Sequence, residues 1–255
     1  MNFIKVAKES GITTVTMSRG KVNAINEAFV DELGAVFNEL AADADTKAVI
    51  LTGDGKFFSF GFDIPELLNY SKNDFARYLK KFCAMYTQMF LLPKPIIGAI
   101  NGHATAGGCI LALTCDFRIM VAGKAKIALN ELNIGLAIFA GCVGMLKSAV
   151  GVRNAEKVLL TGTMYTAGDA QRIGLVDSVT SEETLMAEAK EIANKFSQKN
   201  PDAFKTLKSL LRSPAAECFG RSEERSILDF IEIWYSEPTQ KVLKGVVINK
   251  GESAY

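Results

Sequence analysis

A glycine-rich segment between two apolar runs constrains this chain more than any other feature. Residues 102–110 read Gly-His-Ala-Thr-Ala-Gly-Gly-Cys-Ile. The apolar run at residues 95–100 predicts a buried strand, and the run at residues 110–113 predicts a buried helix. The first N–H groups of a helix have no partner within it and carry about half a positive charge. Since glycine lets a ligand atom approach closely, the segment suits a negatively charged oxygen.

This segment alone leaves two interpretations open. Glycines at a strand–helix junction often serve only close packing. The spacing also differs from the G-x-G-x-x-G of dinucleotide-binding folds and from the G-x-x-x-x-G-K-[ST] of phosphate-binding loops. A ligand site and a packing junction are therefore both compatible with residues 102–110.

An earlier part of the chain has the same strand–turn–helix form. Residues 47–52 predict a buried strand, and residues 57–64 read Phe-Phe-Ser-Phe-Gly-Phe-Asp-Ile. Asp63 is a candidate helix N-cap, with Pro65 in the first turn. A capped loop explains this pattern locally, but the repetition of the form favours a shared site.

Strand and helix patterns alternate through the first part of the chain. The pattern predicts strands at residues 12–17, 47–51, 95–100 and 117–121, and helices at residues 26–42 and 74–91. Such alternation indicates an α/β fold with right-handed connections. From residue 152 the pattern is nearly all helical, with helices expected at residues 182–197, 201–211 and 222–237.

Composition argues against several classes of protein. The 255 residues are 49% hydrophobic, which suffices for one large core. A net charge of +1 without a basic block argues against a nucleic-acid surface, and no apolar run is long enough to span a membrane. Five cysteines without C-x-x-C pairs indicate free thiols in a reducing compartment. No signal-peptide pattern is visible, so we expect a cytoplasmic protein or the mature form of an organellar one.

Together these segments resemble the crotonase (enoyl-CoA hydratase/isomerase) superfamily. The motifs are F-S-x-G-x-D-[IL] at residues 58–64, G-x-x-x-x-G-G-C at 102–109, A-L-N-E at 128–131 and A-x-x-x-G-L-V at 170–176. The resemblance covers nearly the whole chain. It implies a spiral of ββα repeats in a core domain at residues 1–195. It also implies a C-terminal helical trimerisation region at residues 196–255, and homotrimers or hexamers built of two trimers.

The resemblance implies an oxyanion hole made by the backbone amides of Phe62 and Gly107. In the family these amides hold the thioester carbonyl of an acyl-CoA. Proton removal beside a thioester gives an enolate, and fixed amide donors stabilise the charge on its oxygen. Because no side chain is needed for this role, Phe62 can be large where many relatives have alanine.

The family's hydratases use two glutamates, and only one is found here. The first position is Ile110, and the second is Glu131 in an apolar neighbourhood that we expect to raise its pKa. Hydration needs a water that is both held and deprotonated, whereas a single base can move a proton from C2 to C4 of a 3-enoyl-CoA. Ile110 therefore argues against efficient hydration. An exposed acid at a helix start is the alternative interpretation of Glu131.

Residues 106–116 and 129–131 are closest to the family's mitochondrial-type 3,2-trans-enoyl-CoA isomerases, which also have an apolar residue at the position of Ile110. Phe139 stands where dienoyl-CoA isomerases have aspartate. We therefore predict an isomerase of fatty-acid β-oxidation that uses Glu131. The alternatives are another reaction of the fold (weak hydration, thioester hydrolysis or decarboxylation) and a non-catalytic acyl-CoA-binding protein.

The resemblance also implies contacts with coenzyme A at Lys21, Val22, Ala24, Phe60, Asp63 and Ile64. A solvated loop lysine explains Lys21 equally well, and Asp63 fits a helix cap better than a catalyst. No metal and no separate cofactor are expected, because coenzyme A is part of the substrate.

Four further residues are expected to be structural. His103, the only histidine, stands where the family often has tyrosine, so we expect a packing or loop role. Cys109 and Cys115 are expected in the core, and Trp234 in the core or an interface.

Overall fold

Successive strand–strand–helix units divide their strands between two sheets. The computed structural model describes residues 1–246, apart from the side chains of residues 218, 220 and 221. The first strands of the units lie parallel in a six-stranded sheet: β3 (Ala48–Gly53), β5 (Ile96–Ile100) and β7 (Phe117–Val121). The second strands lie parallel in a four-stranded sheet: β4 (Phe57–Ser59), β6 (His103–Thr105) and β8 (Lys126–Ala128). This repetition confirms the expected spiral of ββα units.

Other strands extend both sheets. The larger sheet has the order β1-β2-β3-β5-β7-β10, and the smaller has the order β4-β6-β8-β9. The added strands are β1 (Ile4–Glu9), β2 (Ile12–Met17), β9 (Tyr165–Thr166) and β10 (Ser178–Thr180). Strands β1 and β2 form an antiparallel hairpin, and β2 then runs parallel to β3. The larger sheet is therefore mostly parallel, and its central strands β3 and β5 are buried apart from the half-buried Gly53.

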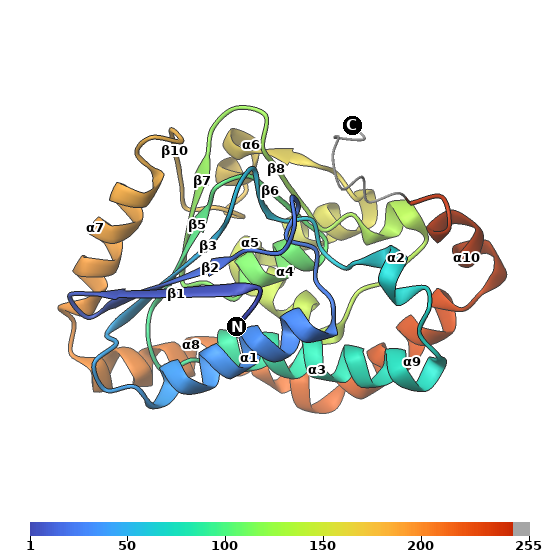
Figure 1. Ribbon diagram of the computed structural model, residues 1–255, viewed down its shortest axis with the longest axis horizontal. Coiled ribbons are helices and arrows are strands. Elements are labelled where there is room, and N and C mark those ends of the chain that lie inside the picture. The colour runs from blue at the N-terminus through green and yellow to red at the C-terminus, as the bar shows by residue number, and fades with distance from the viewer. Residues whose placement is uncertain (247–255) are drawn as a thin grey trace.

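Helices pack around the sheets in the chain order that the alternation predicts (Figure 1). Helix α1 (Glu27–Ala42) follows the β1–β2 hairpin, α2 (Ile64–Leu67) and α3 (Lys72–Phe90) follow β4, and α4 (Gly107–Leu113) follows β6. Asn26 caps α1 by accepting a 3.0 Å hydrogen bond from the Phe29 N–H, and Ser71 caps α3. Helix α7 (Leu185–Ser197) packs against β2, β3, β5 and β7. All seven residues of α4 are buried, so its start lies inside the molecule.

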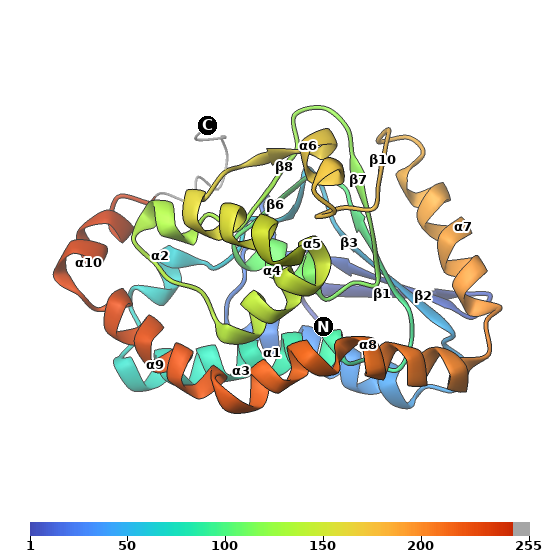
Figure 2. The same cartoon turned by 180° about the vertical axis from the view of Figure 1, so that it is seen from behind.

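The C-terminal helices run along one edge of the molecule beside α3 (Figure 2). After η1 (Glu131–Ile134), α5 (Ala140–Thr161) and α6 (Ala167–Arg172), the chain forms α8 (Pro201–Arg221), α9 (Glu223–Trp234) and α10 (Glu237–Leu243). Helix α8 is anchored by Lys208 and Arg212, whose nitrogens lie 2.6 and 2.7 Å from the two carboxylate oxygens of Asp116.

The structure corrects several sequence-based boundaries. The turn expected at residues 102–108 contains the short strand β6, and the helix expected from residue 110 begins at Gly107. Helix α8 continues through Pro214 to Arg221, although a stop was expected at residue 211. Helix α5 begins at Ala140, but Gly151 has the non-helical angles φ 74° and ψ 164°, so a second helical part begins at residue 152, where the helical region was expected. The last expected helix, at residues 222–237, is two helices, α9 and α10.

The division proposed between residues 195 and 196 falls inside α7, which ends at Ser197. Trimerisation through residues 196–255 stays a prediction, and residues 247–255 lie outside the described part of the chain. The core placement of the buried thiols Cys109 and Cys115 is confirmed.

Candidate active site

Two loops meet where β4 ends and α4 begins. Gly61 has φ +97°, and a Cβ there would lie 3.0 Å from the Gly107 nitrogen. A Cβ on Gly108 would lie 2.1 Å from the Ser59 carbonyl oxygen, so only glycine fits. The Thr105 hydroxyl donates a 2.9 Å hydrogen bond to the Phe60 carbonyl and ties the loops together. The two glycine motifs therefore form one junction.

The amides of Phe62 and Gly107 are available at this junction. Neither N–H has a hydrogen-bond acceptor among residues 1–246. By contrast, the neighbouring Asp63 N–H donates to the Ile25 carbonyl at 3.0 Å, and the Ala106 N–H donates to the Ala128 carbonyl at 2.8 Å. Two N–H groups on adjoining backbone segments, one of them at a helix start, can bind an oxygen that carries negative charge.

Backbone strain helps to position the Gly107 amide. Ala106 has φ 48° and ψ −121°, a conformation that a residue with a Cβ rarely adopts. Such strain costs on the order of 1–3 kcal/mol and is typical of functional sites. The neighbouring contacts hold it in place, because the Ala106 carbonyl also accepts a 3.0 Å hydrogen bond from the Ile110 N–H. Alanine has no sequence preference for this conformation, so sequence reasoning missed it.

Glu131 is a buried carboxylic acid next to this junction in the cavity. It follows β8 as the first residue of η1, and its exposed fraction is 9%. Burial destabilises the carboxylate and raises the pKa of Glu131 to about 7. Its Oε2 atom has no hydrogen-bond partner among the described residues. The expected apolar surroundings are confirmed, although Leu132 is 52% exposed. The alternative of an exposed acid is wrong.

A cavity of about 90 Å³ is lined both by the junction of the two loops and by Glu131. Its walls include Phe62, Gly107, Ile110 and Glu131. Phe60, Ile64, Asn130, Phe139, Phe230 and Trp234 also line it. Glu131 is the only acidic residue among the lining residues that the structure describes. Sequence reasoning placed Trp234 in the core or an interface and did not single out Phe230, because both lie on α9, far along the chain from the motifs.

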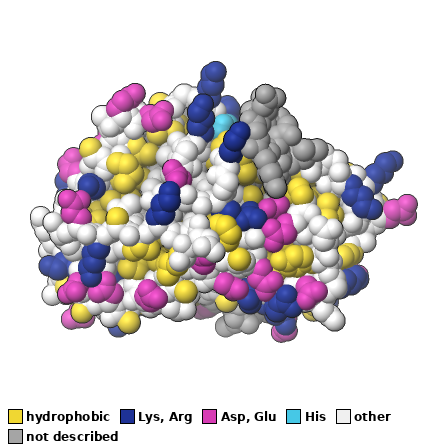
Figure 3. Space-filling view, viewed as in Figure 1, with side chains coloured by type: hydrophobic (Ala, Val, Ile, Leu, Met, Phe, Trp, Pro, Cys, Tyr) yellow, Lys and Arg dark blue, Asp and Glu magenta, His cyan; other side chains and the backbone are white. Residues whose placement is uncertain are grey.

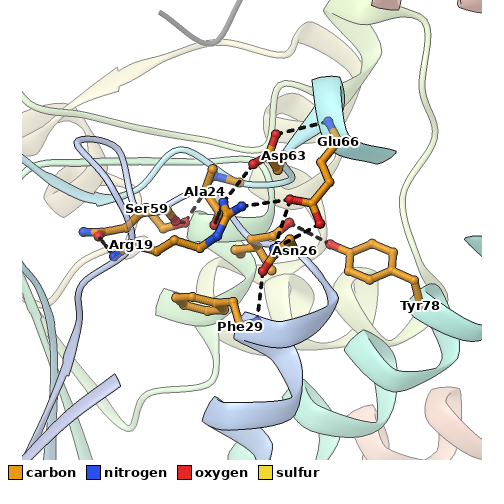
Figure 4. A network of polar contacts seen from close by, with 11 residues as sticks. Arg19, Ala24, Asn26, Phe29, Ser59, Asp63, Glu66 and Tyr78 are labelled. Carbon is orange, nitrogen blue, oxygen red and sulfur yellow. Dashed lines mark hydrogen bonds and ion pairs between the residues drawn. The ribbon is translucent and has the colours of Figure 1, made fainter. Parts of the chain in front are cut away.

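A network around Arg19 fixes the loop that carries the first amide (Figure 4). Its guanidinium lies 2.8 Å from Asp63 and 2.9 Å from Glu66. Asp63 also accepts a 3.2 Å hydrogen bond from the Glu66 N–H as the cap of α2. The Asn26 amide donates to Glu66 at 3.0 Å. Asp63 is therefore a cap and an ion-pair partner, as expected of a structural residue, and Arg19 was missed.

The segment around residues 21–24 lies against the same loop. The Phe60 N–H donates a 2.9 Å hydrogen bond to the Val22 carbonyl, and the Ala24 carbonyl accepts a 2.8 Å bond from Arg19. Lys21 is exposed at this edge. The structure thus places Val22 and Ala24 beside the loop that carries Phe62, and contacts of residues 21, 22 and 24 with coenzyme A stay a prediction.

His103 lies on β6 and does not line the cavity. Its ring stacks on Phe57 with 5.0 Å between centroids. Burial and the nearby Lys126 lower the pKa of His103, so it is neutral at pH 7. The expected packing role is confirmed.

Figure 3 shows side chains of both charges interspersed over one face of the molecule. Within residues 1–246, no helix is long and apolar enough to cross a membrane. In the same range, no group of three His, Cys, Asp or Glu side chains could hold a metal ion.

Comparison with known proteins shows which family combines this fold with this junction. The family model for enoyl-CoA hydratase/isomerase matches residues 7–226. The chain therefore belongs to the enoyl-CoA hydratase/isomerase family and has the crotonase fold.

Relatives of both reaction types are similar to this chain. It is 35% identical to a short-chain-enoyl-CoA hydratase of Clostridium acetobutylicum, over 83% of this chain and 81% of that protein. It is 30% identical to the mitochondrial enoyl-CoA delta isomerase 1 of Rattus norvegicus, over 92% of this chain and 82% of that protein. The crystal structure of human mitochondrial delta3-delta2-enoyl-CoA isomerase superimposes with a TM-score of 0.90 at 27% identity, covering 94% of this chain and 95% of that one.

Proposed function

We propose that this enzyme isomerises 3-enoyl-CoA to 2-trans-enoyl-CoA, with Glu131 as the proton carrier, in fatty-acid β-oxidation. The observation that carries the proposal is that Glu131 is the only acidic residue lining the described cavity, while Ile110 occupies the other catalytic position of the family's hydratases. A pKa of about 7 suits a group that must take and return a proton near neutral pH.

The reaction divides into two proton transfers. The N–H groups of Phe62 and Gly107 hold the thioester carbonyl oxygen, and the Glu131 carboxylate removes a proton from C2. The C2–H electron pair then forms the enolate, whose charge lies on the held oxygen. Protonated Glu131 returns the proton to C4, the double bond moves to C2–C3, and the carbonyl is restored. Each donor is worth about 3–4 kcal/mol in such a site.

The coenzyme A part of the substrate extends in this proposal along Lys21, Val22 and Ala24, past Phe60, Asp63 and Ile64. These residues border the junction, and Lys21 supplies a positive charge at its exposed edge. We further propose that the chain assembles as homotrimers or as hexamers of two trimers, as the family resemblance implies.

Hydration of 2-enoyl-CoA is the second candidate, because the hydratase relative from Clostridium acetobutylicum has 35% identity. Parallel assays of purified protein on 3-hexenoyl-CoA and 2-hexenoyl-CoA distinguish the two reactions. We expect rapid formation of the 2-trans-enoyl product from the first substrate and little 3-hydroxyacyl product from the second. Enzyme-like hydration without isomerisation would contradict the proposal.

A further inference from the structure

Aromatic rings from distant parts of the chain close one side of the cavity. Phe62 follows β4, Phe139 precedes α5, and Phe230 and Trp234 lie on α9. The centroid of the Phe139 ring lies 4.8 Å from that of Phe230 and 6.5 Å from that of Phe62. The Phe230 and Trp234 rings stack with centroids 6.2 Å apart. We call these four side chains the aromatic wall.

The aromatic wall is backed by further buried rings on α3. Phe82 lies 4.9 Å from Phe62 and 6.2 Å from Phe139, between ring centroids. Phe75 lies 4.4 Å from Trp234. Both backing residues are fully buried, where α3 and α9 pack side by side (Figure 1). Because packed interiors leave little free volume, the wall cannot yield without disrupting this core.

The cavity is small for a fatty acyl chain. Its volume is about 90 Å³, whereas an apolar cavity that holds benzene measures about 150 Å³. A thioester held by Phe62 and Gly107, with its reacting carbons beside Glu131, occupies part of that volume. Because the aromatic wall lines the same cavity, acyl carbons beyond the reacting ones meet its rings.

We infer that the aromatic wall restricts this enzyme to short-chain acyl-CoA substrates and that Phe139 sets the length limit. The inference rests on the proposed function, because it takes the two amides as the fixed position of the thioester. Phe139 is the central ring: it is 1% exposed and contacts Phe62 on one side and Phe230 on the other. Substitution by leucine keeps an apolar side chain but removes the flat ring between Phe62 and Phe230.

Binding of saturated acyl-CoAs, which cannot be isomerised, tests the inference by calorimetry. Each buried methylene strengthens binding about fourfold. Hexanoyl-CoA should therefore bind the wild type more tightly than butanoyl-CoA, and decanoyl-CoA at least about tenfold more weakly than hexanoyl-CoA. In Phe139→Leu, the affinity for decanoyl-CoA relative to that for hexanoyl-CoA should rise at least about tenfold above the wild-type ratio. Phe230→Leu tests the wall from α9, and Phe37→Leu, buried on α1 away from the cavity, should keep the wild-type profile.

The outcomes separate this inference from the proposed function. Equal affinity of the wild type for hexanoyl- and decanoyl-CoA overturns the length limit, as does an unchanged profile in both wall variants. If Phe139→Leu does not fold, Phe230→Leu decides. A retained length preference without turnover of 3-hexenoyl-CoA contradicts the isomerase proposal but supports the wall. Absence of all acyl-CoA binding overturns both.

Discussion

Asp116 and Glu131, two of the carboxylates that are largely removed from solvent, have opposite surroundings. Asp116 faces Lys208 and Arg212 at 2.6 and 2.7 Å and also accepts a 2.8 Å hydrogen bond from the Ile96 N–H. Glu131 has no cation beside it and keeps one oxygen without a partner among the described residues. Burying a charge is costly unless it is paired. The difference indicates that Asp116 joins α8 to the core, whereas the surroundings of Glu131 suit the proton carrier proposed above.

The cations around Asp116 show how complete that cluster is. Lys208 also donates to the Lys94 carbonyl at 2.9 Å, and Arg212 donates to the Thr114 carbonyl at 3.0 Å. The Arg212 guanidinium lies 4.0 Å from the centre of the Phe90 ring. Burial lowers the pKa of Lys208 to about 8, which shows what the ammonium loses by leaving water. No such set of partners surrounds Glu131 among the described residues, and burial raises its pKa because the charged form of this acid is the deprotonated one.

The largest effect is expected from Glu131→Gln. The amide has nearly the same shape but cannot take a proton, so isomerisation of 3-hexenoyl-CoA should fall by about 10²–10⁴-fold with acyl-CoA affinity nearly unchanged. Steady-state kinetics and calorimetry measure the two quantities. Glu183→Gln, at an exposed position, is the control and should retain full activity. Activity within a few-fold of the wild type would remove Glu131 from the mechanism.

Asp116→Ala should have its effect on stability. It leaves Lys208 and Arg212 as buried cations without their carboxylate, and such losses cost about 3–5 kcal/mol. Urea unfolding followed by circular dichroism measures the change. Glu191→Gln removes an exposed ion pair with Lys195 and should cost less than about 1 kcal/mol. An equal cost for the two variants would show that the Asp116 cluster is not an anchor.

Gly107→Pro tests the amide rather than the carboxylate. Proline has no N–H, so one of the two donors is lost while Glu131 remains. Turnover should fall by at least about 10²-fold, because the carbonyl charge develops only in the transition state. Circular dichroism must first show that the variant is folded, since the Gly61 backbone lies close to the Gly107 nitrogen. A folded variant with normal turnover would exclude this donor.

The ionisation of Glu131 should make the free energy of unfolding depend on pH, with a smaller effect whose direction is defined. Its pKa is about 7 when folded, against a reference of 4.5, so the folded state binds the proton more tightly. The stability contributed by the protonated acid is complete below pH 4.5 and is lost as the pH rises through 7. Glu131→Gln should therefore be more stable than the wild type by roughly 3 kcal/mol at pH 8 and about equal to it at pH 4.5. Wild-type activity should rise with pH through about 7. A stability difference that does not vary with pH would contradict the buried acid.

The two strand–turn–helix segments that meet at the junction were predictable from local sequence, whereas the roles of the Phe62 and Gly107 amides came from the family resemblance. Two signals carry the local information: glycines where two backbone segments approach closely, and a helix N-cap residue followed by an apolar run. Each signal spans only a few residues. The strands β6 and β8 were missed because three residues are too few to show periodicity. Helix α8 continues past Pro214, where the buried Ala215 packs against Gly144 of α5. Local propensity contains no information about such contacts.

The aromatic wall was the least predictable part of the site. Phe230 and Trp234 reach the cavity only because α9 folds back beside α3, and no pattern in residues 222–237 indicates which face meets a ligand. Glu131 differs in this respect. Its apolar flanks and its A-L-N-E motif predicted a buried acid, and its burial follows from the position of η1 directly after the buried end of β8.

Ile110→Glu should have the smallest effect on turnover, but it tests directly whether the enzyme can hydrate its substrate. Ile110 is 1% exposed and lines the same cavity as Glu131, so a glutamate there would create the paired carboxylates that hydration requires. We expect weak hydration of 2-hexenoyl-CoA where the wild type shows almost none. The gain is limited because the new acid is buried without a cation, and burial favours its protonated form. Ile110→Gln is the matched control: it adds a polar group of similar size that cannot act as a base, and it should not hydrate 2-hexenoyl-CoA.

Equal hydration by the two variants would show that a polar group at residue 110 is enough to admit the water. Hydration by the wild type at enzyme-like rates would show that a single buried carboxylate suffices, and the contrast drawn from Ile110 would then fail.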